Sequence, residues 1–179
     1  ISILNELFEE QTRIIQSWYG DIDKFVGDEV VAVFSGEKAA LHACRAAAAI
    51  RQRLFERKQE FDGLSIGAGI ASGEVIHGML GSHLRADYTV IGDRVNVAAR
   101  LCAAARPNEI IICTCTVDAL KQQTDIPVYI RPPQTHAELF SGHEADRLEL
   151  MGPYSIVLKG KSEKQSVYVM TAAPGKDKL

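Results

Sequence analysis

The sequence predicts a single α+β domain in which helices cover a mostly antiparallel sheet. Stretches with the period of amphipathic helices alternate with short apolar runs typical of strands. The pair Gly27–Asp28 joins two such runs in the manner of a two-residue β-hairpin turn. The chain has 179 residues, 46% of them hydrophobic, which suits one domain with a substantial core. An α/β arrangement is the alternative that the same pattern leaves open.

The first third of the chain is expected to hold two long helices with a hairpin between them. Apolar side chains recur at helical spacing over 4–18, so an amphipathic helix opens the chain and Gly20 ends it. Strands at 24–26 and 30–34 flank the Gly-Asp turn. Residues 37–57 are rich in alanine and place apolar residues on one side, which predicts the second helix.

The remaining elements alternate between strands and shorter helices. Residues 64–71 alternate large and small side chains, which predicts a buried strand approached closely through Gly67 and Gly69. Residues 131–147 contain prolines and show weak periodicity, so we expect a loop-like excursion there. The other predicted elements are strands at 74–80, 88–91 and 109–113, a helix at 94–105 capped by Asp93, a short helix at 116–122, and closing strands at 155–158 and 167–170. The domain should span 1–171, with a flexible tail over 172–179.

Composition excludes several classes of function. A net charge of −3 gives no general attraction to nucleic acid. No apolar stretch is long enough to span a membrane, and no signal-peptide pattern is present. The four cysteines lack paired metal-ligand spacing, which favours free thiols in a reducing compartment such as the cytoplasm. The five histidines show no ligand spacing either.

Two short stretches carry the residues best suited to chemistry on a polyphosphate. Asp28 lies on a tight turn beside a glycine, where a carboxylate suits Mg²⁺ or serves only as a turn residue. Asn96 and Arg100 are one helical turn apart, so an amide and a guanidinium share a face and can reach one anionic group. Taken alone, the pair could equally be the solvated edge of an amphipathic helix.

Lysines and further acids near these stretches admit two interpretations each. Lys159 and Lys161 flank a glycine after an apolar strand, where they could contact a triphosphate or be solvated. Lys24 starts the hairpin and could hydrogen-bond a purine or extend into solvent. Glu29 and Asp93 could pair with the carboxylate of Asp28, although turn and cap roles are preferred for them.

Four ordered stretches together resemble the catalytic domain of class III adenylyl and guanylyl cyclases, in the subgroup with Lys and Thr at its purine-reading positions. The resemblance covers nearly the whole chain and rests on GDIDKFVGDEVVAVF (20–34), GIASGEVIHGMLG (69–81), YTVIGDRVNVAARL (88–101) and SIVLKGKSE (155–163). It implies a ferredoxin-like, palm-like core and a head-to-tail homodimer with active sites at the shared interface. It also implies conversion of ATP to 3′,5′-cyclic AMP and pyrophosphate with two Mg²⁺ or Mn²⁺ ions at each site.

The resemblance also implies a role for each candidate residue. Asp28 matches one of the family's two metal-binding aspartates, and Asn96 matches the asparagine that positions the ribose. Arg100 matches the arginine that stabilises charge on the α-phosphate in the transition state. Lys159 matches the lysine that contacts the terminal phosphates, and Lys24 matches the lysine that reads adenine.

Thr89 falls at the second purine-reading position of the family. A lysine and a threonine still suit adenine, because the lysine donates to a ring nitrogen and the hydroxyl contacts the amino group. Asp87, two residues earlier and on the same strand face, is an alternative reader. A glutamate in place of Lys24 would have favoured GTP.

The sequence departs from the family in one respect that concerns the metal. The family's other metal-binding aspartate lies on a strand before the first helix, and no residue here matches it. We therefore expect the whole protein to be an active cyclase, and this chain alone, with half a metal site, to be weak or inactive. The missing strand would be central to the sheet, so its absence should expose an edge.

Two functions other than an adenylyl cyclase are also compatible with the sequence. One is a catalytically silent cyclase homology domain that dimerises or binds nucleotide as a regulator. The other is a guanylyl cyclase. Family members often carry sensory or membrane modules, so regulatory domains and a membrane tether elsewhere in the protein are compatible with a cytoplasmic catalytic domain that does not itself insert into a membrane.

Overall fold

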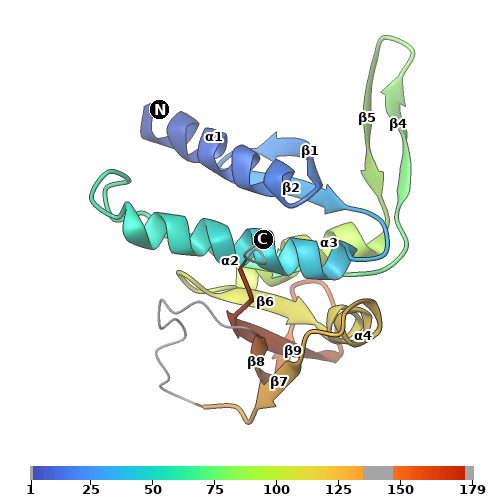
Figure 1. The fold of residues 1–179 in the computed structure, drawn as a ribbon. Helices are drawn as coiled ribbons and strands as arrows, with labels where there is room; N and C mark the ends of the chain where they lie inside the picture. Colours follow the sequence, from blue (N-terminus) through green and yellow to red (C-terminus); the bar gives the residue numbers. More distant parts are fainter. Residues whose placement is uncertain (1, 135–146, 176–179) are drawn as a thin grey trace.

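The computed structural model describes residues 2–134 and 147–175 and arranges them in stacked layers (Figure 1). A five-stranded sheet forms one layer, helix α2 lies across it, and α1 with the β1–β2 hairpin lies on the far side of α2. The elements are α1 (Ser2–Ser17), β1 (Gly20–Val26), β2 (Glu29–Phe34), α2 (Ala39–Glu56), β3 (Ala68–Ile70), β4 (Ile76–Ser82), β5 (Arg85–Ile91), α3 (Asp93–Ala104), β6 (Ile110–Cys113), α4 (Thr114–Gln123), β7 (Val128–Arg131), β8 (Leu148–Val157) and β9 (Lys164–Ala172).

The main sheet has the order β3-β6-β9-β8-β7. Its outer pairs, β3 with β6 and β7 with β8, are parallel, and its inner pairs are antiparallel. The β1–β2 and β4–β5 hairpins form two further antiparallel sheets. Four of the six strand pairings in the described part of the chain are therefore antiparallel, and the predicted α+β class is confirmed.

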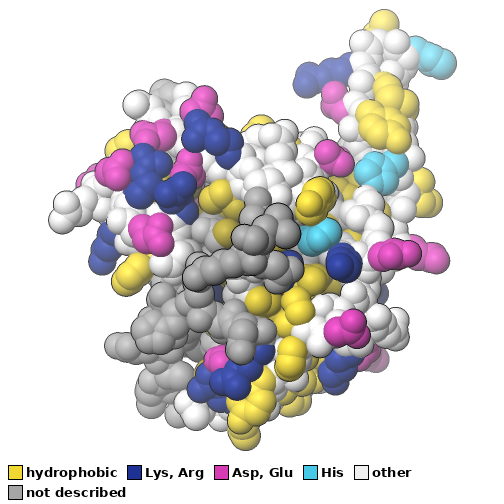
Figure 2. All heavy atoms as spheres, viewed as in Figure 1, with side chains coloured by type: hydrophobic (Ala, Val, Ile, Leu, Met, Phe, Trp, Pro, Cys, Tyr) yellow, Lys and Arg dark blue, Asp and Glu magenta, His cyan; other side chains and the backbone are white. Residues whose placement is uncertain are grey.

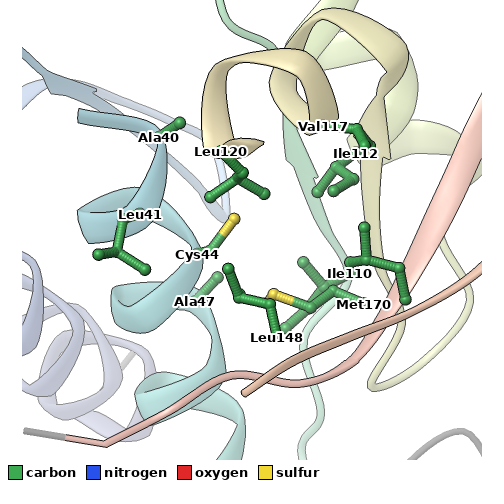
Figure 3. Packing of buried hydrophobic residues seen from close by; sticks show 11 residues of the cluster. Ala40, Leu41, Cys44, Ala47, Ile110, Ile112, Val117, Leu120, Leu148 and Met170 are labelled. Atoms are coloured by element: carbon green, nitrogen blue, oxygen red, sulfur yellow. The ribbon is translucent and has the colours of Figure 1, made fainter. Parts of the chain in front are cut away.

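The largest core cluster lies between the five-stranded sheet and the helices α2 and α4 (Figure 3). Helix α2 contributes mostly small side chains, which let it approach the sheet closely. Ile110 and Ile112 of β6 point into this cluster, and both are fully buried. The other buried members are Ala40, Leu41, Cys44, Ala47, Val117, Leu120, Leu148, Leu150 and Met170.

Helix α3 covers the opposite face of the same sheet. Because successive side chains of a strand alternate between faces, Ile111 and Cys113 of β6 meet Val97 and Leu101 of α3. The approach of α3 to β3 is unusually close at Gly69, where an added Cβ would lie 2.7 Å from the Leu101 Cβ and nearer still to the helix backbone. The predicted close approach to this strand is confirmed, and the approaching element is α3.

Several local predictions differ from the structure. Helix α1 ends at Ser17, earlier than the predicted end at Gly20. Tyr19 (φ 64°) adopts the left-handed backbone conformation after the helix, and Gly20 already belongs to β1. The predicted cap at Asp93 is wrong, since Gly92 is the N-cap and Asp93 begins α3 without a capping bond.

The chain after α2 also contains more strand than expected. Strand β4 has the predicted length but begins and ends two residues later, β5 is longer than predicted, and the two pair as a hairpin that projects from the body (Figure 1). The predicted excursion over 131–147 begins as strand β7, and most of it lies outside the described residues. Strand β9 runs to Ala172, and the Pro174 carbonyl accepts a hydrogen bond of 3.1 Å from Arg45 Nε. Residues 176–179 of the expected tail lie outside the described residues.

Replacing Gly69 by alanine should destabilise the domain by about 1–3 kcal/mol, because the new methyl group would push α3 away from β3. Gly78→Ala is the matched control, since a Cβ on Gly78 of β4 would meet no heavy atom within 4 Å. Urea unfolding of the two variants checks this. Equal stability of both variants would contradict the packing of α3 described above.

Candidate active site

The structure brings together Lys24 of β1 and Thr89 of β5, the two residues assigned to purine reading. Lys24 Nζ donates to Thr89 Oγ1 over 2.6 Å. A third residue, Asp23, accepts from the Thr89 hydroxyl over 2.8 Å and lies 3.1 Å from Lys24 Nζ. Residues that are 65 positions apart in sequence therefore form one hydrogen-bonded group.

A β-bulge explains how two consecutive residues can face the same neighbour. Side chains of adjacent strand residues normally point to opposite faces. In β1 the pairing shifts between Ile22 and Lys24, which leaves Asp23 opposite no residue of β2. A bulge of this kind turns the strand and redirects a side chain. Asp23 and Lys24 can thus both reach Thr89.

Asp23 also joins the two hairpins through the backbone. Its second oxygen, Oδ1, accepts the Val90 backbone N–H over 3.1 Å, so both carboxylate oxygens are engaged. Its side chain is only 6% exposed, and Thr89 and Val90 are buried. The base of the projecting β4–β5 hairpin is therefore attached to β1 at the purine-reading pair.

Burial by itself raises the pKa of the Asp23 carboxyl, but other effects outweigh it. Hydrogen bonds from Thr89, Lys24 and Val90, together with the positive charge of Lys24, leave the pKa below its ordinary value. Asp23 is accordingly an anion that only accepts hydrogen bonds at neutral pH.

The second group of candidates gathers around α3 and the turn that lies against it. Arg100 is partly buried, and its guanidinium lies against the β8–β9 turn, where a Cβ on Gly160 would be 3.5 Å from Arg100 Nη2. Asn96, one turn earlier, is exposed. This turn carries Lys159 and Lys161, so the structure places Arg100 beside the predicted phosphate-binding lysines.

The two lysines of this turn differ in environment. Lys161 Nζ lies 3.5 Å from Asp93 Oδ1, and Asp93 Oδ2 also accepts from Arg94 over 3.2 Å. Lys159 is exposed, and no hydrogen bond or ion pair engages it within the part of the chain that the structure describes. Lys159 is therefore the lysine whose ammonium group is available to a ligand.

Asp28 stands apart from both groups, at the exposed tip of the β1–β2 hairpin. Gly27 adopts φ 63° there, a conformation that glycine takes without strain. Burial raises the pKa of the Cys102 thiol on α3, and the negative charges of Glu29 and Asp28 raise it further. Arg100 lies on α3 against the β8–β9 turn, so Asp28 and Arg100 belong to different elements of the subunit.

Asp28 fits one ligand position of a magnesium ion, since Mg²⁺ binds through one or two carboxylates and completes its shell with water and phosphate oxygens. Within 2–134 and 147–175, however, no group of three or more His, Cys, Asp or Glu side chains could hold a metal ion. Asp28 is therefore a candidate for a single metal ligand, and the described residues do not bring two further such ligands to it.

Asp23 is the member of the site that sequence reasoning missed. The only signal was a carboxylate directly before Lys24, and ordinary strand alternation would have sent it to the opposite face. Asp87, the alternative reader, is exposed and pairs in register with Leu80, whereas Lys24 bonds to Thr89.

Comparison with known proteins identifies the class to which this fold and site belong. The family model for the adenylate and guanylate cyclase catalytic domain matches residues 1–169. The chain therefore belongs to the adenylate and guanylate cyclase catalytic domain family, and the resemblance seen in the sequence is confirmed.

Individual relatives agree with this assignment. The chain is 35% identical over 132 residues to an uncharacterized protein of Mycobacterium tuberculosis, covering 69% of this chain and 23% of that protein. It resembles the adenylyl cyclase CyaB from P. aeruginosa with a TM-score of 0.72 and 27% identity, over 94% of this chain and 80% of that one. The fold also matches the guanylyl cyclase Cya2 with a TM-score of 0.77 and 24% identity, over 99% and 83% of the two chains.

These matches define a nucleotide cyclase fold, but they do not distinguish ATP from GTP as the substrate. The matched proteins include both an adenylyl and a guanylyl cyclase. The chain spans about a quarter of the length of the curated relative described above. No helix in the described ranges has the length and apolar character needed to cross a bilayer.

The free energy of unfolding should fall on acidification partly through Asp23. A carboxyl whose pKa is lower in the folded state stabilises the fold above its unfolded-state pKa, and this contribution disappears as pH falls through the lower, folded-state pKa. Urea unfolding of the wild type and of Asp23→Asn between neutral pH and pH of about 2 measures this contribution. The stability difference should be largest near neutral pH and shrink below pH of about 4. A difference independent of pH would show that Asp23 is not held as an anion.

Proposed function

We propose that this domain is an adenylyl cyclase that converts ATP to 3′,5′-cyclic AMP and pyrophosphate. The observation that carries the proposal is the contact between Lys24 and Thr89 over 2.6 Å. An ammonium group only donates hydrogen bonds, and N1 of adenine only accepts them. In guanine, N1 carries a hydrogen and is itself a donor. A lysine ammonium at this position would therefore place two donors against each other. The pair therefore suits ATP.

The groups around α3 suit the rest of the nucleotide. Arg100 is the residue for the α-phosphate, because a guanidinium can bind two phosphate oxygens at once. The Asn96 amide, on the same helix face, is placed for the ribose. Lys159 has an unengaged ammonium group next to Arg100 and is assigned to the terminal phosphates.

The reaction is an in-line displacement at the α-phosphorus. A bond forms between the ribose 3′-oxygen and the α-phosphorus, the bond to the bridging oxygen breaks, and pyrophosphate leaves with that electron pair while the hydroxyl proton passes to solvent. Lys24 and Thr89 hold the base, and Asn96 orients the hydroxyl. Arg100 stabilises the charge that grows on the α-phosphate in the transition state. A divalent ion held in part by Asp28 would lower the pKa of the hydroxyl and neutralise the leaving group.

A homodimer would complete each site. Within one subunit Asp28 lies at the exposed tip of the β1–β2 hairpin and Arg100 lies on α3 against the β8–β9 turn, so we assign the two to one nucleotide only across a head-to-tail interface. Exposed apolar residues on the projecting hairpin (Figure 2) support such an interface. They are Ile76, Met79, Leu80, Leu84, Tyr88 and Ile91.

We also propose where in the cell the domain acts and what controls its activity. ATP is an intracellular nucleotide, and all four cysteines are free thiols, which suits a cytoplasmic location. Because the domain corresponds to a minor part of its relative's length, we assign the control of its activity to regulatory domains elsewhere in the protein.

A catalytically silent cyclase homology domain is the second candidate. It is favoured by one observation, that no group of three or more His, Cys, Asp or Glu side chains in the described residues could hold a metal ion. Such a domain would bind nucleotide or dimerise without turnover.

Incubation of the intact protein with Mg²⁺ or Mn²⁺ and an equimolar mixture of ATP and GTP tests the proposal. We expect cyclic AMP and pyrophosphate in equal amounts, with little cyclic GMP, measured by chromatography. Predominant cyclic GMP would identify a guanylyl cyclase. Nucleotide binding without either product, under both metals, would identify the silent domain.

Mixing two inactive variants tests the shared site. Asp28→Ala and Arg100→Ala homodimers should each lose most activity, because each lacks one half of both sites. In an equal mixture half of the dimers are mixed and hold one intact site, so about a quarter of wild-type activity should return. A double variant, Asp28→Ala with Arg100→Ala, mixed with wild type is the control for subunit exchange. No recovery despite exchange would contradict the shared interface.

A further inference from the structure

We propose that Asp23 is a specificity-determining positioning residue that makes the Thr89 hydroxyl a pure hydrogen-bond acceptor toward the purine. This inference rests on the proposed function, since it concerns how the same site chooses its nucleotide. Asp23 itself need not touch the nucleotide, because it acts through Thr89 and Lys24.

The hydrogen of the Thr89 hydroxyl is committed within the site. A hydroxyl has one hydrogen and two lone pairs. Asp23 Oδ2, 2.8 Å away, belongs to a carboxylate and can only accept, so the hydrogen points at it. Lys24 Nζ, 2.6 Å away, can only donate and therefore occupies one lone pair. One lone pair remains, and the hydroxyl can offer a ligand only an acceptor.

Asp23 is fixed in the orientation that this role requires. Its other oxygen accepts the Val90 N–H over 3.1 Å, so the carboxylate cannot rotate away without leaving a buried amide unsatisfied. The same oxygen that holds the Thr89 hydrogen lies 3.1 Å from Lys24 Nζ. Two of the three ammonium hydrogens are thus directed to Thr89 and Asp23, and the third is left for a ligand.

The resulting pattern of one donor from Lys24 and one acceptor from Thr89 distinguishes the purines. Adenine offers an acceptor at N1 and a donor in its 6-amino group, which matches both groups. Guanine offers a donor at N1 and an acceptor at O6, so its oxygen would face the remaining lone pair of Thr89. A hydroxyl without Asp23 could turn its hydrogen toward O6 and accept guanine as well. Asp23 therefore contributes discrimination against GTP.

Asp23→Asn is the sharpest test, because the side chain keeps its shape. The Val90 N–H should retain the amide oxygen, which places the NH₂ group where Oδ2 accepted the Thr89 hydrogen. The amide then donates to Thr89, and the hydroxyl hydrogen becomes free to serve guanine. We expect the ratio of ATP to GTP affinity to fall by about tenfold. Asp21→Asn, an exposed change two residues earlier on β1, should leave the ratio unchanged.

The measurement is competition of ATP and of GTP against a fluorescent nucleotide on the intact protein, with the ratio of kcat/KM values taken in parallel. An unchanged ratio in a folded Asp23→Asn variant would overturn the proposal. Should that variant fail to fold, Thr89→Val should lower the same ATP to GTP ratio, because Lys24 alone then discriminates between the purines, and a ratio equal to that of the wild type would likewise overturn the proposal. Absence of cyclic nucleotide in the wild type would defeat the proposed function, while the binding ratios would still decide the role of Asp23.

Discussion

The buried carboxylate of Asp23 is the interaction on which the nucleotide-reading part of the structure depends. Taking an ionised carboxylate out of water is costly unless hydrogen bonds and an opposite charge replace its hydration. Here Thr89, Val90 and Lys24 supply these interactions, and the donors come from two different hairpins. The need to satisfy one anion therefore aligns β1 with β5, and this alignment positions the two side chains proposed to read the purine.

A second constraint, the close packing of α3, positions the groups proposed to bind the phosphates. The helix approaches β3 where Gly69 leaves no side chain between them, and its Val97 and Leu101 reach the sheet face beneath. That packing turns the face bearing Asn96 and Arg100 away from the core. The β8–β9 turn, which continues from the same sheet, then brings Gly160 and its flanking lysines to Arg100. The residues proposed for base reading and those proposed for phosphate binding are thus held by separate elements of one subunit.

The separation of Asp28 from Arg100 gives the domain its proposed dependence on a partner. Two groups carried by separate elements of one subunit can be brought to the same small ligand twice when two copies are related by a twofold axis. The projecting β4–β5 hairpin fits this arrangement, because its apolar side chains are largely exposed and the pair proposed to read the purine lies at its base. The same hairpin would then contribute to both dimer formation and nucleotide specificity.

The sequence by itself determined the class of fold, the family and the candidate residues. The period of α2, the continuous apolar run of β6 and the Gly-Asp turn are local signals, and Lys24, Thr89, Asn96 and Arg100 lie within motifs that can be read directly from the chain. Only the tertiary structure decided that Asp23 belongs to the site, because a bulge overrides the two-residue alternation that local reasoning assumes. It also decided that Lys161 pairs with Asp93 whereas Lys159 has no such partner among the described residues, since ion pairs between distant segments leave no trace in local spacing. Pairings of this kind arise from long-range packing, which is why the arrangement of the site could not be derived from the order of its residues.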